Sequence, residues 1–160
     1  MSDFPELHTL WDYNDPAGTA VRFQQLLPAV EASDNRAYHV ELLSQLARTH
    51  SLRRQFAEAY DLLDHAQALL TDEMVVPRMR CLLERGRCFN SAGEPEQALP
   101  LFREAFGLGT AVGTQADYHT IDAAHMMAIA EPMPVNQLQW NEAALILAEA
   151  SPDVRAGGWR

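Results

Sequence analysis

Apolar residues recur along this chain at intervals of three and four, the period of an amphipathic α-helix. No stretch keeps the strict apolar–polar alternation of a half-buried strand, and β-branched residues are few and scattered. Proline, glycine and short polar turns divide the helical pattern into segments. The predicted helices span about residues 15–32, 36–52, 55–70, 78–91, 94–106, 115–130 and 135–150.

Local signals set several of these helix ends. Asp15-Pro16 supplies an N-cap followed by the proline that the first turn of a helix favours. Gly93 suits a helix C-terminus, and Pro77 predicts a break before the fourth helix. Three glycines predict a loop after the fifth helix: Gly107, Gly109 and Gly113. Two prolines fall inside predicted helices and would kink them or shift their ends: Pro28 and Pro100.

Four stretches of the helical pattern can be superimposed on one another. In each, a small residue is followed four residues later by a large apolar one, and three after that by Ala or Leu. The small residues, at steps of 40, 39 and 45, are Thr19, Ala59, Ala98 and Ala143. Ala47 and Gly86 each lie 12 residues before such a position, where a small side chain lets two helices approach closely. The chain therefore contains an internal repeat.

The stretch from Leu82 to Phe106, LLERGRCFNSAGEPEQALPLFREAF, resembles the tetratricopeptide repeat family. The positions that carry the resemblance are Gly86, Phe89, Gly93, Ala98, Phe102 and Ala105. The preceding stretch, ELLSQLARTHSLRRQFAEAYDLLDHA, matches as well, but it has Arg54 at the usual turn glycine. The third hairpin departs at Pro132-Met133-Pro134, and the first helix resembles only the second half of a repeat.

The resemblance covers roughly residues 36–150 and implies an all-α fold, a right-handed α–α superhelix of about three helical hairpins preceded by one extra helix. The single domain, residues 1–160, would contain a half-repeat at about 15–32 and repeats at about 36–70, 78–106 and 115–150. Neighbouring hairpins must stack, because each has an apolar face that it cannot bury alone. Generic helical hairpins without that family's packing are the alternative.

In this family the first helices of successive hairpins line a concave surface, which defines candidate binding residues here. Alignment on the small residues gives two inward rows, one through Arg48, Arg87 and His125 and another through Glu41, Arg80 and Tyr118. A third row contains Asn90. The predicted partner-binding residues are Arg48, Arg80, Arg87, Asn90, Tyr118 and His125.

Composition narrows the class of partner. A formal net charge of −10 disfavours nucleic acid, because binding to phosphates needs a basic surface. The basic residues are all arginines, whose planar guanidinium groups suit bidentate contacts with carboxylates. An acidic peptide or protein is the predicted partner, although the same arginines could simply pair with Glu41, Glu84 or their neighbours. Ser44 and Arg48 stand where chaperone-binding members of the family carry a lysine-and-asparagine clamp, so binding to a chaperone is not implied.

No membrane segment, secretion signal, cofactor motif or metal motif is recognisable, so a cytoplasmic location without cofactor or metal is expected. Cys81 and Cys88 lie two turns apart on one predicted helix, about 10 Å along its axis, and are expected to be buried free thiols. The helix after Gly113 carries His119, Asp122 and His125, but its two histidines are six residues apart and diverge around the helix.

Three functional hypotheses remain. A protein-interaction scaffold without catalysis predicts an open polar groove. A sensor for a small molecule or peptide predicts a closed pocket lined by Tyr118, His125 and methionines. An enzyme predicts His119, Asp122 and His125 converging on one cavity, or a bound metal. No polar capping helix is recognisable after the C-terminal hairpin, only the N-cap pattern Ser151-Pro152-Asp153 of a further helix. Two expectations follow: either the natural repeat array is longer, or the exposed hairpin pairs with a second copy in a homodimer.

Overall fold

The computed structural model describes residues 3–159, and in this part of the chain every regular element is a helix. The α-helices are α1 (Pro16–Ala32), α2 (Arg36–Leu52), α3 (Phe56–Leu69), α4 (Val75–Ser91), α5 (Pro95–Val112), α6 (Asp117–Ala130) and α7 (Pro134–Ala150). Short 3₁₀ helices are η1 (Leu7–Leu10), η2 (Gly113–Ala116) and η3 (Val154–Trp159). The all-α prediction is confirmed. None of the described helices is long and apolar enough to cross a bilayer.

The starts of α1 and α2 follow from side-chain caps. Asp15 Oδ1 accepts the Gly18 N–H at 3.0 Å, and Pro16 occupies the first turn as the sequence predicts. Asn35 Oδ1 accepts the Tyr38 N–H at 3.0 Å in the same way. Each cap satisfies a backbone donor that has no partner within its own helix, so these boundaries were predictable from single residues.

Two predicted breaks are wrong. Helix α4 begins at Val75, and Pro77 lies inside its first turn, where a missing N–H breaks no helical hydrogen bond. Helix α5 runs through Gly107 and Gly109 to Val112, so the predicted glycine loop is helical until Gly113. Gly109 is buried, and a Cβ atom there would collide with Thr120 and Met79. This glycine therefore allows a close helix contact and does not form a loop.

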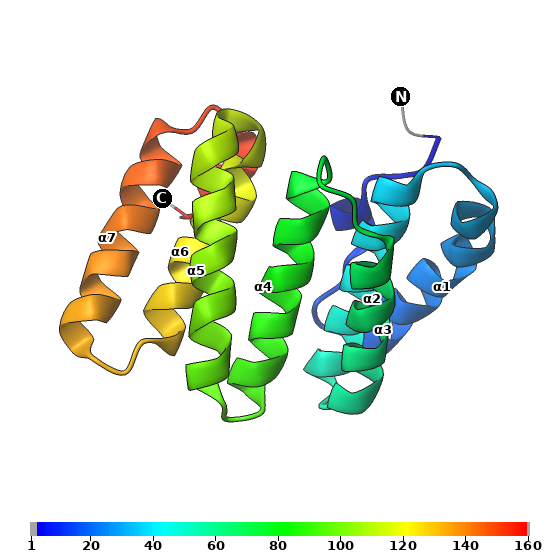
Figure 1. Ribbon diagram of the computed structural model, residues 1–160, viewed down its shortest axis with the longest axis horizontal. Coiled ribbons are helices and arrows are strands. Elements are labelled where there is room, and N and C mark those ends of the chain that lie inside the picture. The colour runs from blue at the N-terminus through cyan, green and yellow to red at the C-terminus, as the bar shows by residue number, and fades with distance from the viewer. Residues whose placement is uncertain (1–2, 160) are drawn as a thin grey trace.

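Consecutive helices run in alternating directions and pack side by side, as Figure 1 shows. The pairs α2–α3, α4–α5 and α6–α7 are in contact, and α4 also contacts both α2 and α6. Helices α2, α4 and α6 are therefore neighbours in space although they are not consecutive in the chain. This adjacency brings their side chains to one surface.

Small residues hold the two helices of a hairpin close together. Gly86 of α4 lies against the Phe102 ring of α5, which a Cβ atom at residue 86 would overlap. Ala47 of α2 packs in one apolar cluster with Ala59 and Leu63 of α3. The close approach predicted at Ala47 and Gly86 is thus present in both hairpins.

The turns of the first two hairpins share an unusual backbone conformation. Gly93 has φ 84° after α4, and Arg54 has φ 60° at the matching place after α2. A left-handed conformation costs a residue with a side chain about 1 kcal/mol. Arg54 replaces the usual glycine at that cost, and its guanidinium group lies over the Phe56 ring at 5.2 Å.

The cysteines are buried free thiols, as expected. Burial raises the pKa of Cys81 to about 12 and that of Cys88 to about 11. Both thiols therefore stay protonated near neutral pH and are poor nucleophiles.

Candidate functional site

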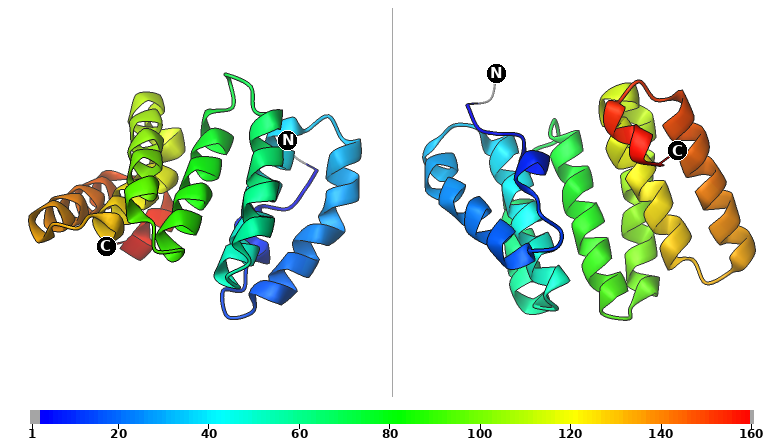
Figure 2. Two further views of the ribbon diagram at one scale, coloured as in Figure 1. Left: turned by 60° about the horizontal axis from the view of Figure 1, so that its bottom comes forward. Right: turned by 180° about the vertical axis from the view of Figure 1, so that it is seen from behind.

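A cleft of about 990 Å³ lies over α2, α4 and α6, and segments near both ends of the described chain form its sides. Figure 2 (right) shows the N-terminal segment with η1 and the C-terminal η3 on the same face of the molecule. The lining from α2 includes Glu41, Gln45 and Arg48. The lining from α4 includes Arg80, Glu84 and Arg87, and that from α6 includes Tyr118, His119 and Asp122.

A continuous series of ion pairs forms the floor of the cleft. Glu84 Oε1 accepts from Arg48 Nη1 at 3.3 Å and from Arg87 Nη1 at 2.7 Å. Arg87 Nη2 also donates to Asp122 Oδ2. The four charged groups, which we call the ion-pair chain, are Arg48, Glu84, Arg87 and Asp122. They connect α2, α4 and α6 through side chains alone.

The ion-pair chain is largely shielded from water. The side chain of Glu84 is 3% exposed, and that of Asp122 is also buried. Burial alone would raise the pKa of Asp122, but the charge and hydrogen bond of Arg87, together with the charge of Arg48, outweigh burial and hold that pKa below its ordinary value. Asp122 and Glu84 in turn raise the pKa of Arg87 against the effect of its burial. Arg87 and Asp122 thus keep each other ionised.

Aromatic side chains of the N-terminal segment form one wall of the cleft. Trp11 Nε1 donates to Gln45 Oε1 at 2.9 Å, which ties the segment to α2. The Trp11 and Tyr13 rings stack with centroids 4.5 Å apart, and the Arg48 guanidinium lies 5.2 Å from the Tyr13 centroid. Tyr38 of α2 holds the segment a second time, because its hydroxyl donates to the Pro5 carbonyl at 2.6 Å.

The opposite wall is formed by η3 and the start of α6. Arg155 lies over the Tyr118 ring at 4.7 Å and donates to both carboxylate oxygens of Asp153, at 3.1 and 2.8 Å. Ser151 and Asp153 cap this turn, since the Asp153 N–H donates to Ser151 Oγ and the Arg155 N–H to Asp153 Oδ1. The predicted N-cap therefore starts a short 3₁₀ helix, which packs Ala156 into the α6–α7 core.

His119 is a buried residue of the cleft lining. Burial lowers its pKa to about 3, and Arg80, Arg155 and Arg87 act in the same direction against Asp122. The ring is therefore neutral at pH 7 and carries one donor and one acceptor nitrogen.

Lowering the pH from 6 to 4 is expected to reduce the free energy of unfolding by about 2 kcal/mol through His119. Below its ordinary pKa of 6.5, the unfolded chain binds a proton on this ring, which the folded protein does not bind until about pH 3. Urea denaturation at several pH values measures the effect. His119→Gln should flatten the acid slope and His8→Gln, at an exposed position, should not. Equal slopes in the two variants would contradict the assignment.

Four of the six predicted partner-binding residues line the cleft: Arg48, Arg80, Arg87 and Tyr118. Asn90 and His125 are half-buried and are not among the lining residues. Arg87 pairs with Asp122, one turn before His125, so the floor includes the first two residues of that predicted row, Arg48 and Arg87, and ends before the third, His125. The alternative pairing of arginines with Glu41 and Glu84 is confirmed, with Arg80 Nη1 3.1 Å from Glu41 Oε2.

The N-terminal wall and Arg155 were not predicted. One signal could have identified the wall, because Phe4, Trp11 and Tyr13 place three aromatic side chains before the first predicted helix. Large aromatic residues outside a helix need something to pack against. Arg155 carries no comparable signal, since it lies in a short segment rich in glycine.

The features expected of a sensor or an enzyme are only partly brought together. Met126 and Met127 pack in the core and Met133 is exposed, so none of these methionines lines the cleft. His119 and Asp122 line the cleft and His125 does not. Among the described residues, no three His, Cys, Asp or Glu side chains are grouped so as to hold a metal ion.

No protein-family model, curated protein or solved structure matches this chain.

Proposed function

We propose that this protein is a non-catalytic interaction module of tetratricopeptide type, which binds a peptide or a segment of a partner protein in the cleft. The observation that carries the proposal is that α2, α4 and α6 all contribute polar side chains to one half-open cleft. A right-handed superhelix of hairpins, as the sequence resemblance implies, would produce such a surface. The glycine contact at Gly86 and the matching turns at Arg54 and Gly93 support this repeat.

The chemistry of the cleft favours an acidic segment. Arg48 and Arg80 are partly exposed, while Glu84 and Asp122 lie buried in the floor beside them. Along the ion-pair chain, the guanidinium of Arg48 therefore reaches the ligand side while the carboxylates do not; at the Arg80–Glu41 pair both partners reach it, at 16% and 24% exposed. A carboxylate on the ligand would gain charge-assisted hydrogen bonds there, at a site partly screened from water.

The walls supply contacts that do not depend on charge. Tyr13 and Tyr118 line opposite sides of the cleft, where Tyr13 stacks on Trp11 and Arg155 lies over the Tyr118 ring. Side chains of this kind bury a large area at a low cost in conformational entropy, which is why they are common in binding surfaces. The combination suits a short extended segment with an acidic residue next to an apolar one.

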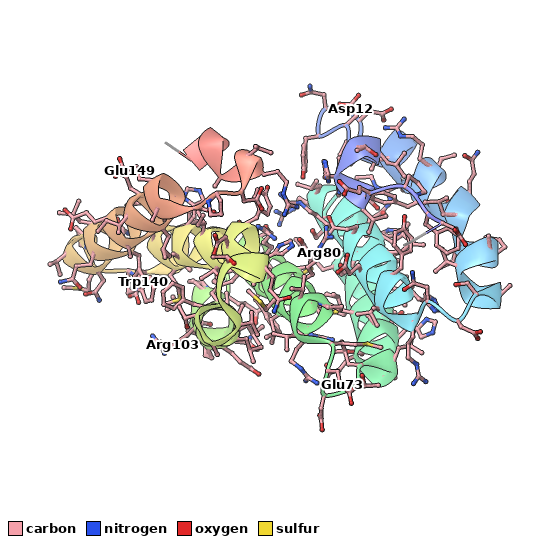
Figure 3. The ribbon with its side chains drawn as sticks, turned by 90° about the horizontal axis from the view of Figure 1, so that it is seen from above. Asp12, Glu73, Arg80, Arg103, Trp140 and Glu149 are labelled. Carbon is pink, nitrogen blue, oxygen red and sulfur yellow. The ribbon has the colours of Figure 1, made fainter. Side chains whose placement is uncertain are left out.

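Replacing Arg80 with glutamine is expected to weaken peptide binding about tenfold, or roughly 1.4 kcal/mol. A display library of random peptides, selected on the wild-type protein, supplies the probe, and fluorescence anisotropy gives the dissociation constants. Arg103→Gln is the matched control, because it removes the same charge from an exposed position on α5. Figure 3 shows Arg80 near the middle of the molecule and Arg103 at its outer edge.

The selected peptides should be enriched in Asp and Glu and should bind Arg103→Gln as tightly as the wild type. Unchanged thermal unfolding of both variants would show that the fold is intact. Failure of the library to yield any binder, or equal binding to the two variants, would contradict the proposal.

A further inference from the structure

The outward side of α7 exposes a stripe of large apolar side chains. Val135, Leu138, Leu145 and Ile146 are 57%, 58%, 42% and 66% exposed. With Ile129 and Met133 they make six of the ten large apolar side chains exposed in the described part of the chain. Exposed apolar residues are ordinary when scattered, but a contiguous group indicates an interaction surface.

Helix geometry places these residues on one side of α7. The interval from Val135 to Ile146 rises about 17 Å, and its spacing of three, seven and eight residues keeps the side chains on one face. The opposite face is also apolar, since Ala144 and Ala148 are buried and the Trp140 ring packs on Phe106 at 5.1 Å. A helix that is apolar on both sides is normally covered on both.

The charges around the stripe have one sign. From Asp117 to Asp153 the sequence contains six acidic residues and no arginine or lysine, and three of the six, Glu131, Glu142 and Glu149, belong to α7 or the turn before it. Glu142 and Glu149 are exposed on the same side of α7 as the apolar stripe. They have no cation on their own helix with which to pair. The surface is therefore apolar and negatively charged at the same time.

This charge distribution disfavours a second copy of the chain on the stripe and favours a basic helix of another protein. Glu142 lies within the stripe, between Leu138 and Leu145, so a two-fold axis near the centre of the stripe would bring Glu142 close to its own copy. No arginine or lysine of α6 or α7 could offset that repulsion. A helix with an apolar stripe flanked by arginine or lysine would cover the same residues and neutralise both glutamates.

We propose that the outer face of α7 binds an amphipathic helix of a partner protein, through Val135, Leu138, Leu145 and Ile146, with Arg or Lys of the partner at Glu142 and Glu149. This site is separate from the cleft and does not depend on the function proposed for it. The recognition would be the packing of one helix on another, in which apolar residues anchor and flanking charges select.

A synthetic helix with leucine at every third or fourth position and lysine beside each leucine is the probe, and its glutamate counterpart is the matched control. Binding is measured by titration calorimetry against the wild type and two variant pairs, Leu138→Ser with Ile146→Ser and Glu142→Gln with Glu149→Gln. Each variant pair should bind the lysine helix at least tenfold more weakly than the wild type does, and the glutamate helix should not bind to any of the proteins. A third pair, Glu58→Gln with Glu104→Gln, removes exposed acids of α3 and α5 and should bind like the wild type.

Three outcomes would overturn the proposal. If the Glu58→Gln, Glu104→Gln variant lost as much affinity for the lysine helix as the Glu142→Gln, Glu149→Gln variant, the helix would be attracted to an acidic protein in general and not to this face. Unchanged binding after the serine substitutions would exclude the apolar stripe as the anchor. Sedimentation velocity could also show that the wild-type protein alone is a dimer and that the Leu138→Ser, Ile146→Ser variant is a monomer. That result would mean that a second copy of the chain covers this face. Arg80→Gln should leave binding of the lysine helix unchanged, which separates this test from that of the cleft.

Discussion

Replacing Glu84 with alanine is expected to lower the free energy of unfolding by about 3–5 kcal/mol. Glu84 Oε1 accepts from both Arg48 and Arg87, and the carboxylate is almost completely buried. Its removal leaves two guanidinium groups close together, with Arg87 partnered only by Asp122 and Arg48 by aromatic ring faces. Loss of one member of a buried ion pair costs far more than the pair itself contributes. Chemical denaturation monitored by circular dichroism gives the value.

Asp64→Ala supplies the matched control. Asp64 pairs with Arg85 at 2.7 Å, a shorter distance than that between Glu84 and Arg48, but its side chain is 69% exposed. Exposed pairs contribute about 0–1 kcal/mol, so this variant should be nearly as stable as the wild type. If the two variants lost similar stability, burial could not be what makes the ion-pair chain important.

The second large effect is expected at Gly86. A leucine at this position should lower the free energy of unfolding by about 3 kcal/mol, because its Cβ overlaps the Phe102 ring and forces α4 and α5 apart. Gly107→Leu is the control, since Gly107 also lies within a helix but has open space at its Cβ position. That variant should be neutral or slightly stabilising, because glycine is a poor helix former.

A double-mutant cycle identifies the contact directly. Phe102→Ala in the wild-type background leaves a cavity in the core, whereas in the Gly86→Leu background it also relieves the overlap. The loss caused by Phe102→Ala should therefore be smaller in the second background. Additive losses would show that the ring and residue 86 do not interact.

Much of the fold was predictable, because short-range signals set most helix ends. The caps at Asp15 and Asn35 give the starts of α1 and α2 within the accuracy of any helix assignment. The predicted loop at Gly107 and Gly109, which is the end of α5 in the structure, was wrong for a physical reason. Glycine has low helix propensity, but the contact of Gly109 with α6 outweighs the cost, and that contact is not encoded in neighbouring residues.

The candidate site was predicted best where the sequence repeat is most regular, although Tyr118 of the less regular third hairpin also lines the cleft. Arg48, Arg80 and Arg87 come from α2 and α4, whose hairpins align closely, and all three line the cleft. The alignment of α6 rests on a weaker match, and the residue that meets Arg87 is Asp122 and not His125. The wall around Trp11 has no helical periodicity in the sequence, and its only sequence signal is the group of aromatic residues before α1.

The ion-pair chain has a consequence for how this sequence can change over time. Arg48, Glu84, Arg87 and Asp122 belong to three helices but share hydrogen bonds, so no one of them can be exchanged independently. Reversal or loss of one charge requires a compensating exchange on a neighbouring helix. In descendants and relatives of this chain, these four positions should vary together or not at all, and that covariation would be a sequence signature of hairpin stacking.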